Sequence, residues 1–364
     1  MSEKHPTSES AEYVLKRQDN GALALFNPAL GETMHPGVGP WEEATRLYAG
    51  AGGLADALTA RGRWSGETGE VVVFDVGLGG AANALGALAT RHELAARHKS
   101  QGRPAPRPLR VVSFEHDLSP LRKAVECAAE LAYPLGWEDT LRQLMTQGQW
   151  ADPAGEVHWE LRMGDLTELV KVEPRRGDLM FFDPFSPRSN PEAWTVDVFS
   201  ALYAARRPGG DAMLVTYSSS PASRAAMLLG GWFVGKGPSI GKVRQTTQAA
   251  SRFSWLDEPL DRRWVALWRQ EAHPWPLGTP PSRRPQVRRE LLEHLQWMQA
   301  GGLDESDDQD ENSGGAGKPG KPGSKPNPGK KPGTGKPNPG KRSGKGRDGV
   351  WAKYPQRGYQ KPSK

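Results

Sequence analysis

An aspartate between aromatic side chains is the residue in this sequence whose surroundings are best suited to chemistry. Asp183 lies in the segment Phe181-Phe-Asp-Pro-Phe-Ser-Pro187, which follows a short apolar run. Its carboxylate can accept a proton or a hydrogen bond from an amine, and an amine must be unprotonated to act as a nucleophile. Three nearby aromatic side chains can stack on a flat ring: Phe182, Phe185 and Trp194. We therefore interpret Asp183 as the base or orienting group for an amine substrate. The alternatives are a turn without chemistry and core packing of Trp194.

A glycine-rich turn supplies the second candidate site. The sequence Asp75-Val-Gly-Leu-Gly-Gly-Ala-Ala-Asn83 joins an apolar run to a segment rich in Ala and Leu. Its three glycines, Gly77, Gly79 and Gly80, allow a tight turn, and the N–H groups that begin the following helix can bind a ligand. Either a dinucleotide or S-adenosylmethionine suits this geometry. With S-adenosylmethionine, we expect Asp75 to hold the ammonium group of the amino-acid portion. A turn without a ligand is the alternative.

Two further carboxylates follow neighbouring strands. Glu115 ends the second apolar run and can accept the ribose hydroxyls of either cofactor, whereas Asp165 can accept from the adenine amino group. Nicotinamide fingerprints place the ribose carboxylate about 20 residues after the glycines, but 36 residues separate Gly79 from Glu115. The spacing therefore favours S-adenosylmethionine. The alternatives are a solvated loop acid for Glu115 and a helix N-cap for Asp165.

Alternating strands and helices must position these residues. Apolar runs predict buried strands at 70–75, 109–114, 178–182 and 212–217, and the alternation of residue types at 158–162 predicts a further strand. The Ala- and Leu-rich segment at 81–97 predicts a helix, and Ser119 with Pro120 predicts the start of another. Repeated strand–helix units predict an α/β fold with a Rossmann-like, doubly wound, mostly parallel sheet, whose ligands bind beyond the carboxyl ends of the strands.

Two more elements are expected nearer the C-terminus. The apolar segment at 264–268 predicts a late antiparallel strand. Residues 290–298 predict an amphipathic helix, and its apolar face is formed by Leu291, Leu292, Leu295 and Met298.

Charge is distributed unevenly along the 364 residues. The formal net charge is +6, but residues 313–364 carry 14 Lys and Arg and one Asp, and residues 304–311 carry six acids and no base. Residues 1–303 are close to neutral, with 34 bases and 35 acids. The basic segment is rich in Gly and Pro and holds an 11-residue tandem repeat at 325–346. We therefore expect a disordered, extended arm there.

Several classes of protein are disfavoured by composition. The single cysteine, Cys127, argues against a disulfide framework and a multi-Cys zinc site and suits a reducing cytoplasm. We expect no secretory signal and no transmembrane span, because the first 30 residues lack an apolar region and no long uncharged apolar run occurs. Metal-ligand spacings are lacking too, so no metal site is expected. His35 is interpreted as a satisfied loop histidine, and a place beside the pocket is the alternative.

Around Asp183 the sequence resembles the MnmC-like methyltransferase domain, which acts on the wobble uridine of tRNA and occurs alone or fused to an FAD oxidase. The family pattern is aromatic-Leu-Asp-Gly-Phe-x-Pro-x-x-Asn-Pro-x-x-Trp. It is matched within 181–194 at Asp183, Phe185, Pro187, Asn190, Pro191 and Trp194. Residues 40–48, which include Glu43, resemble the family's N-terminal acidic segment, and the resemblance as a whole covers about residues 13–270.

The sequence also departs from the family pattern. Pro184 replaces the glycine after Asp183, Ala81 replaces the third glycine of the cofactor turn, and Gln245 replaces a glutamate. These departures leave the cofactor and the fold little affected and bear on the identity of the substrate nucleoside.

The resemblance implies methyl transfer from S-adenosylmethionine to the amine of 5-aminomethyl-(2-thio)uridine at the wobble position of tRNA, in the cytoplasm, without FAD or metal. It implies catalytic roles for Asp183, Phe185 and Trp194. Cofactor contacts are expected at Asp75, Gly77, Gly79, Gly80, Asn83, Glu115, Asp165, Asp183 and Glu43. RNA phosphate contacts are expected at Arg224, Lys236, Lys242 and Arg244. The basic tail is expected to add sequence-independent attraction to RNA phosphates.

These inferences divide the chain into segments and leave alternatives. The segments are a disordered N-terminus (1–12), the methyltransferase domain (13–270), a linker with an amphipathic helix (271–303), an acidic linker (304–312) and the disordered basic tail (313–364). The alternatives are a methyltransferase for another amine, an RNA-binding module of the same fold without catalysis, and a nicotinamide oxidoreductase.

Overall fold

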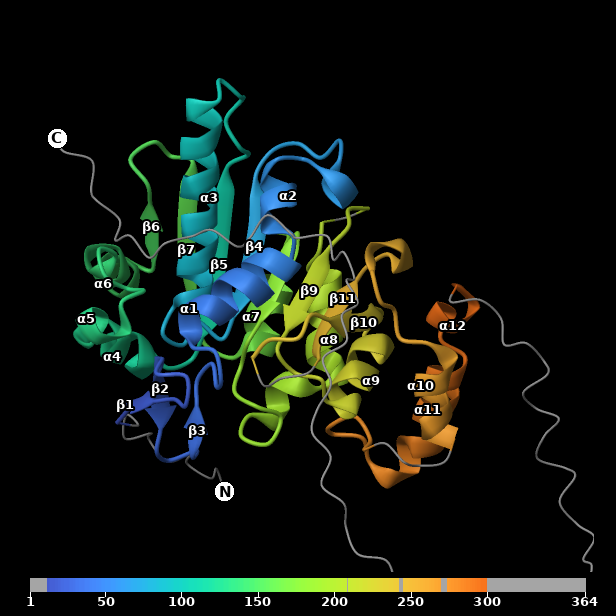
Figure 1. Ribbon diagram of the computed structural model, residues 1–364. Coiled ribbons are helices and arrows are strands. Elements are labelled where there is room, and N and C mark those ends of the chain that lie inside the picture. The colour runs from blue at the N-terminus through green and yellow to red at the C-terminus, as the bar shows by residue number, and fades with distance from the viewer. Residues whose placement is uncertain (1–11, 208, 242–244, 270–273, 300–364) are drawn as a thin grey trace, which may run out of the picture. The chain divides into compact units, whose positions relative to one another are not determined.

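An eight-stranded sheet organises the part of the chain that the computed structural model describes, namely residues 12–207, 209–241, 245–269 and 274–299 (Figure 1). Its strand order is β10-β11-β9-β8-β4-β5-β7-β6. The four pairs at its centre, β9 with β8, β8 with β4, β4 with β5 and β5 with β7, are parallel. The pairs at the two edges are antiparallel. The predicted doubly wound, mostly parallel sheet is therefore confirmed, whereas the predicted acidic and basic segments lie outside the described residues.

The strands and helices have the following bounds. The central sheet contains β4 (Val71–Val76), β5 (Leu109–Glu115), β6 (Gln149–Ala151), β7 (Val157–Met163), β8 (Leu179–Phe182), β9 (Met213–Thr216), β10 (Phe233–Gly237) and β11 (Thr246–Ala250). A small antiparallel sheet contains β1 (Val14–Arg17), β2 (Leu23–Asn27) and β3 (Glu32–Thr33). The α-helices are α1 (Pro40–Glu43), α2 (Leu54–Leu58), α3 (Ala82–Ser100), α4 (Ser119–Glu126), α5 (Ala128–Leu131), α6 (Glu138–Gln147), α7 (Leu166–Val172), α8 (Val196–Ala204), α9 (Pro221–Leu229), α10 (Arg262–Arg269), α11 (Arg284–Leu292) and α12 (Leu295–Gln299). Shorter or wider helical turns are η1 (Ala44–Ala51), η2 (Gly62–Trp64), η3 (Pro191–Trp194), η4 (Phe253–Trp255) and η5 (Pro281–Arg283).

Helices cover both faces of the central sheet (Figure 1). Along β4, Val71 and Val73 join the apolar cluster under η1, α2, α3, α4 and α6. Val72 and Phe74 join the opposite cluster, which packs against α8, α9, α10 and α11. A strand buried on both faces reads as a continuous apolar run, which is why β4 was predictable from its sequence.

The predicted late strand at 264–268 is wrong, because these residues form part of the helix α10. The spacing of Trp264, Val265 and Trp268 suits one face of a helix as well as a strand, and Val265 and Trp268 are buried in the core. The antiparallel strands beyond β9 are instead β11 and β10. None of the described helices combines the length and the apolar composition that a membrane crossing requires.

The predicted helix at 290–298 is also corrected. It is divided into α11 and α12, so Leu291 is buried while Leu295 and Met298 are 62% and 71% exposed. Instead, Trp297 packs in the core, and the buried Gln296 amide forms hydrogen bonds with the edge strand β10. Its Oε1 accepts from Val234 N–H at 2.6 Å, and its Nε2 donates to the carbonyl oxygens of Val234 and Leu260 at 2.7 and 2.8 Å.

These contacts bear on the predicted linker at 271–303. The described part of that segment, 274–299, packs on the same body as the sheet rather than leading away from it.

Candidate active site

The turn after β4 brings the glycine-rich segment against the end of β8. Gly77 and Gly79 have φ angles of 83° and 51°, in the left-handed region that favours glycine. A Cβ atom on Gly77 would lie 2.7 Å from the backbone oxygen of Asp183, so this approach requires glycine. The Gly79 N–H donates to Glu115 Oε2 at 3.0 Å. The predicted cofactor turn, Glu115 and Asp183 therefore meet at the carboxyl ends of β4, β5 and β8.

Asp75 is fully buried at the end of β4. Its Oδ2 accepts from Ser113 Oγ at 2.7 Å, and Ser113 Oγ in turn accepts from Trp159 Nε1 at 2.9 Å. Asp75 Oδ1 has no hydrogen-bond partner among the described residues. Burial, and to a smaller degree the negative charge of Asp183, raise the pKa of Asp75 to about 7 against the lowering effect of the Ser113 hydrogen bond. An unpaired buried oxygen of this kind fits an ammonium group, which would donate to it.

The other two predicted cofactor carboxylates differ in their contacts. Glu115 Oε1 accepts from the backbone N–H groups of His116 and Asp117 at 2.8 and 3.1 Å, which fixes its carboxylate beside the turn. Asp165 is exposed and caps α7, where its Oδ1 accepts from Glu168 N–H at 3.2 Å. The helix N-cap alternative therefore describes Asp165 here, and its contact with adenine stays a prediction.

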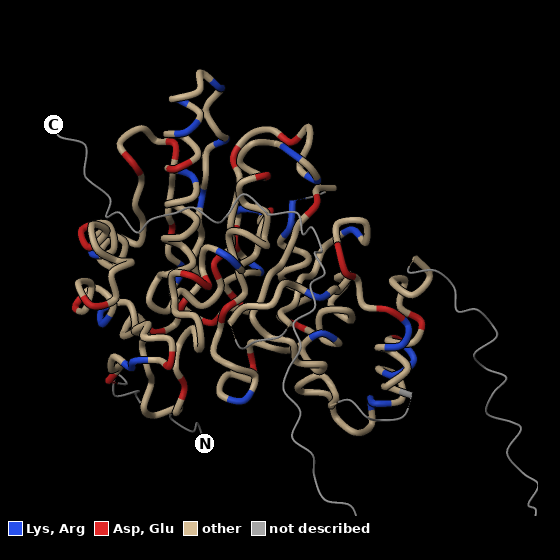
Figure 2. The backbone as a smooth tube through the Cα atoms, in the orientation of Figure 1, with Lys and Arg blue, Asp and Glu red and all other residues tan. Residues whose placement is uncertain are grey.

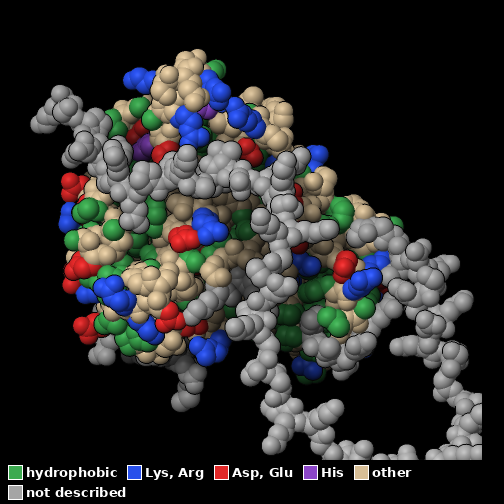
Figure 3. Space-filling view, in the orientation of Figure 1, with side chains coloured by type: hydrophobic (Ala, Val, Ile, Leu, Met, Phe, Trp, Pro, Cys, Tyr) green, Lys and Arg blue, Asp and Glu red, His purple; other side chains and the backbone are tan. Residues whose placement is uncertain are grey.

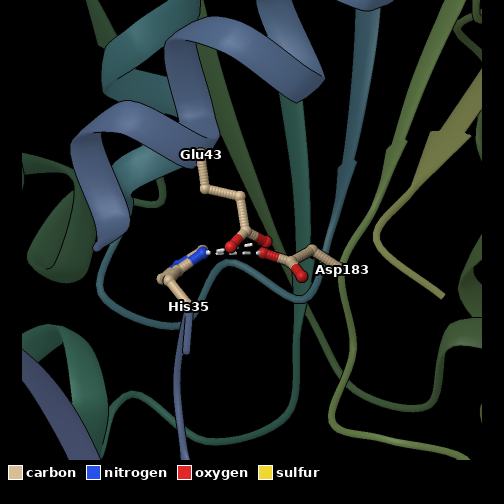
Figure 4. Close-up of side chains that lie close together, drawn as sticks. All are labelled: His35, Glu43 and Asp183. Carbon is tan, nitrogen blue, oxygen red and sulfur yellow. Dashed lines mark ion pairs between the residues drawn. The ribbon is translucent and has the colours of Figure 1, made fainter. Parts of the chain in front are cut away.

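Asp183 lies in a cluster of polar side chains just beyond β8. Its Oδ2 accepts from Asn83 Nδ2 at 2.7 Å, so the end of α3 nearest the glycine turn orients the carboxylate. His35 Nδ1 lies 3.6 Å from this same oxygen and 3.6 Å from Glu43 Oε1 (Figure 4). The structure thus brings together three residues predicted for the site, Asp183, Asn83 and Glu43, and adds a histidine to them.

Of the two interpretations of His35, the structure supports a place beside the pocket rather than a satisfied loop histidine. Its Nδ1 is buried and has no hydrogen-bond partner among the described residues, and its φ of 52° is left-handed. Tyr48 was not predicted as a site residue. It is fully buried, and burial together with the charges of Asp183 and Glu43 raises its pKa well above 10. Tyr48 follows Glu43 by five residues, a spacing that does not share a face of an α-helix. The wider η1 segment between them carries no sequence signal that we recognise.

The aromatic residues around Asp183 divide into core and rim. Phe182 and Trp194 are fully buried, with ring centroids 5.0 Å apart in an edge-to-face arrangement. The predicted stacking of a substrate ring on Trp194 or Phe182 is therefore wrong, and core packing is the correct alternative. Trp194 Nε1 donates to the Phe185 carbonyl at 2.8 Å, which braces the loop. Phe185 itself is only partly buried and stays a candidate for stacking.

The predicted RNA-binding set is also revised. Arg224 is 4% exposed and donates to Thr247 Oγ1, Gln245 Oε1 and the Thr246 carbonyl at 2.9 to 3.0 Å, and burial lowers its pKa to about 10. It therefore joins α9 to β11 and is not available to a phosphate. Lys236 is exposed on β10. Lys242 and Arg244 lie outside the described residues.

One atom from each of three clustered side chains, those of His35, Glu43 and Asp183, lies within 4.8 Å of the other two, a distance at which they could share a cation. Burial lowers the pKa of His35, but the charges of Asp183, Glu43 and Asp75 outweigh it and raise that pKa to about 9. The imidazole ring is thus itself the cation between the two carboxylates near neutral pH.

Several known proteins are similar to this chain in sequence. Residues 135–252, which include Asp165 and Asp183, match a family model described as S-adenosyl-L-methionine-dependent methyltransferase. The chain is 26% identical over 260 residues to the "tRNA 5-methylaminomethyl-2-thiouridine biosynthesis bifunctional protein MnmC" of Cupriavidus necator, a match that covers 66% of this chain and 35% of that protein. It is 36% identical over 102 residues to the protein of the same name from Ralstonia nicotianae, covering 28% of this chain and 15% of that protein. The chain therefore spans about a third or less of the length of these relatives.

A solved structure shares the fold. The crystal structure of MNMC2 from Aquifex aeolicus aligns with a TM-score of 0.54 and 21% identity, over 78% of this chain and 85% of that one. The chain is therefore similar in sequence to MnmC proteins and, over residues 135–252, to S-adenosyl-L-methionine-dependent methyltransferases, and it has a Rossmann-like fold.

Proposed function

We propose that the chain transfers a methyl group from S-adenosylmethionine to the amine of a 5-aminomethyl group on the wobble (2-thio)uridine of tRNA, in the cytoplasm. The observation that carries this proposal is the Asp183 carboxylate, which is buried beside the cofactor turn and oriented by Asn83. The names of the relatives, which refer to tRNA 5-methylaminomethyl-2-thiouridine biosynthesis, favour this substrate over other amines.

The residues of the turn fit S-adenosylmethionine. Asp75 Oδ1 would accept from its ammonium group, and the backbone at Gly77, Gly79 and Gly80 would approach its amino-acid portion. Glu115, fixed by three backbone N–H groups, would face the ribose hydroxyls. When bound, the sulfonium supplies an electrophilic methyl carbon, and the protein's task is to position and deprotonate the nucleophile.

Asp183 would act on the amine of the substrate. The amine arrives largely as an ammonium ion, and its proton passes to the Asp183 carboxylate, which leaves a lone pair on nitrogen. That lone pair forms the new N–C bond as the C–S bond breaks and its electron pair stays on sulfur. Phe185, partly exposed beside Asp183, would stack on the uracil ring, since RNA bases read outside a helix are commonly splayed onto aromatic side chains.

The direct test is Asp183→Asn assayed with S-adenosylmethionine and tRNA that carries 5-aminomethyl-2-thiouridine, with the nucleosides quantified by mass spectrometry. We expect kcat to fall by about 10²–10⁴, the range of general-base catalysis. Asp139→Asn is the matched control, because that side chain is 98% exposed and pairs with Arg142 on the same helix. Methyl transfer by Asp183→Asn at the wild-type rate would show that Asp183 is not the proton acceptor.

Two further measurements separate this function from the alternatives. Calorimetric titration with S-adenosylmethionine should give heat; if it gives none while RNA still binds, the chain is a non-catalytic RNA-binding module. Nucleosides of tRNA from cells that lack this gene should accumulate the aminomethyl-uridine. If they do not, and the purified protein consumes S-adenosylmethionine with another amine, the substrate is wrong although the reaction class stands.

A further inference from the structure

Two buried carboxylates face one imidazole beside the proposed proton acceptor. The side chains of His35, Glu43 and Asp183 are only 11%, 6% and 10% exposed. Figure 4 shows the imidazole directed at the gap between the two carboxylates, while the second oxygen of Asp183 points away from the pair. Carboxylates this close raise each other's pKa unless a positive charge lies between them. The ionisation of Asp183 therefore depends on what occupies the position of His35.

The fold holds His35 in a backbone conformation that few residues adopt. Its φ is 52°, which histidine tolerates better than most non-glycine residues. The Gln18 side chain clamps this turn: its Nε2 donates to the His35 carbonyl at 3.1 Å and its Oε1 accepts from the Gly37 N–H. Backbone strain of this kind persists where the surrounding contacts enforce it, and it concentrates at functional sites.

We infer that His35 is a positioning residue whose imidazolium keeps Asp183 ionised and apart from Glu43, so that Asp183 can take the proton of the substrate amine. This inference rests on the proposed function. The proton of the amine moves to Asp183, and His35 keeps its own proton throughout. His35 thus acts through Asp183 and does not react with the substrate.

Among the residues that the structure describes, the other titratable groups that act on His35 and Asp183 supply no compensating positive charge. Asp75 at the end of β4 adds a further negative charge that acts on His35. Tyr48 and Tyr217 have pKa values raised well above 10, by burial and then by the charge of Asp183, so both stay neutral. Burial raises the pKa of Asp183 to about 6; the charge of His35 lowers it and the charge of Glu43 raises it. Without the imidazolium, that pKa should rise further.

The test is the pH dependence of kcat/KM in His35→Asn, because asparagine tolerates a left-handed backbone but carries no charge. We expect the acid limb of the profile to move up by one pH unit or more, so that activity at pH 5 falls about ten-fold and activity near pH 9 approaches that of the wild type. The amine of the substrate titrates identically in every variant. His158→Asn is the matched control: that histidine lies on β7, bonded to the Gly155 carbonyl, and its loss should leave the profile unchanged.

A double variant separates an electrostatic role from a structural one. His35→Asn with Glu43→Gln should bring the acid limb back towards the wild-type position, because the second carboxylate no longer needs a counter-ion. If His35→Asn lowers activity equally at every pH and Glu43→Gln does not correct it, the inference is overturned. Activity that is lost with EDTA and restored by Zn²⁺ would likewise overturn it, since a metal ion would then supply the positive charge.

A readout without substrate distinguishes this inference from the proposed function. The ¹⁵N signals of the His35 ring, assigned by their absence in His35→Asn, should show both nitrogens protonated at pH 7 and deprotonation only near pH 9. A neutral ring at pH 7 would refute the inference whatever the substrate is. A protonated ring in a protein that does not methylate tRNA would refute the proposed function alone.

Discussion

Three carboxyl groups and one imidazole share the small buried volume around Asp183. Asp75, Glu43 and Asp183 all lie within the range in which their charges shift the pKa of His35. Burying like charges costs stability unless a counter-charge or a hydrogen bond offsets it. At the scale of the residue, this concentration of buried carboxylates therefore costs folding free energy.

The variant Asp75→Asn tests whether a buried carboxylate at this site lowers the free energy of unfolding. The pKa of Asp75 is raised by burial to about 7, so its contribution to stability is fully present below pH 4 and is lost as the pH rises through 7. We expect the variant to be more stable than the wild type at pH 8 and no more stable at pH 4, because asparagine has no proton to lose. Between these limits the two curves of unfolding free energy against pH should diverge by at most about 1.4 kcal/mol per pH unit.

The same variant should bind S-adenosylmethionine more weakly, at least ten-fold by calorimetry, since it lacks the charge that would hold the ammonium group. Chemical denaturation at several pH values supplies the stability data. Parallel stability curves for variant and wild type would show that Asp75 titrates normally in the folded protein.

At the scale of the element, the turn between β4 and α3 determines where Asp183 lies. Gly77→Ala should both destabilise the fold and displace Asp183, because the added methyl group would meet the Asp183 backbone 2.7 Å away. Gly155→Ala is the matched control: Gly155 also has a positive φ, 68°, but a Cβ there meets nothing within 4 Å. We expect about 1–2 kcal/mol of destabilisation in the control from the left-handed backbone alone.

Gly77→Ala should lower the free energy of unfolding by more than Gly155→Ala does. It should also abolish methyl transfer, whereas Gly155→Ala should keep full activity. Urea unfolding and the tRNA methylation assay measure the two effects. Equal behaviour of the two variants would mean that the contact between Gly77 and Asp183 does not determine the site.

An apolar run such as Val71–Val76 predicts a buried central strand, because a strand covered on both faces is apolar along its length. The glycine turn and Asp183 were predictable for the same reason: their positions follow from where parallel strands end. The spacing of Trp264 and Trp268 suits either a strand or a helix, and only the packing decides for α10.

Other site features depend on contacts that are distant in the sequence. His35 became a site residue through Gln18, Glu43 and Asp183, and nothing next to it in the sequence reveals those partners. Arg224 has the charge and donors of a phosphate ligand, but its guanidinium donates to acceptors on β11 instead. The resemblance to a family located Asp183 and Asn83. It did not distinguish Phe185, which is partly exposed and can contact a ligand, from Trp194, which is buried in the core.

At the scale of the whole molecule, charge is divided between a near-neutral body and the segment at 313–364. Figure 2 shows Lys and Arg along α10 and α11, and Figure 3 shows basic and acidic side chains interspersed over the described part of the visible face. The formal charge of +6 therefore belongs to the C-terminal segment, which carries 14 Lys and Arg.

Truncation after Leu303 tests what that segment does. We expect the KM for tRNA to rise at physiological salt while the affinity for S-adenosylmethionine stays unchanged, because the lysines would supply attraction to phosphates that does not depend on sequence. The salt dependence of tRNA binding should also become less steep. A chain whose tail lysines are replaced by glutamine is the matched control for length and should behave like the truncation. Equal tRNA kinetics with and without the tail would leave it no part in substrate binding.

The amide of Gln296 has a consequence for production of the protein. Edge strands are templates for association between chains unless their free backbone groups are covered. Here the outer edge of β10 is occupied by residues 258–260 and by the Gln296 side chain, which takes both backbone groups of Val234. In a growing chain the Val234 N–H on that edge has no partner until residue 296 has been synthesised, 62 residues after Val234. A recombinant fragment cut at residue 270 would keep every residue of the proposed site, but the edge strand β10 would lack the Gln296 amide. We expect that fragment to aggregate, whereas a fragment ending at residue 303 should stay monodisperse.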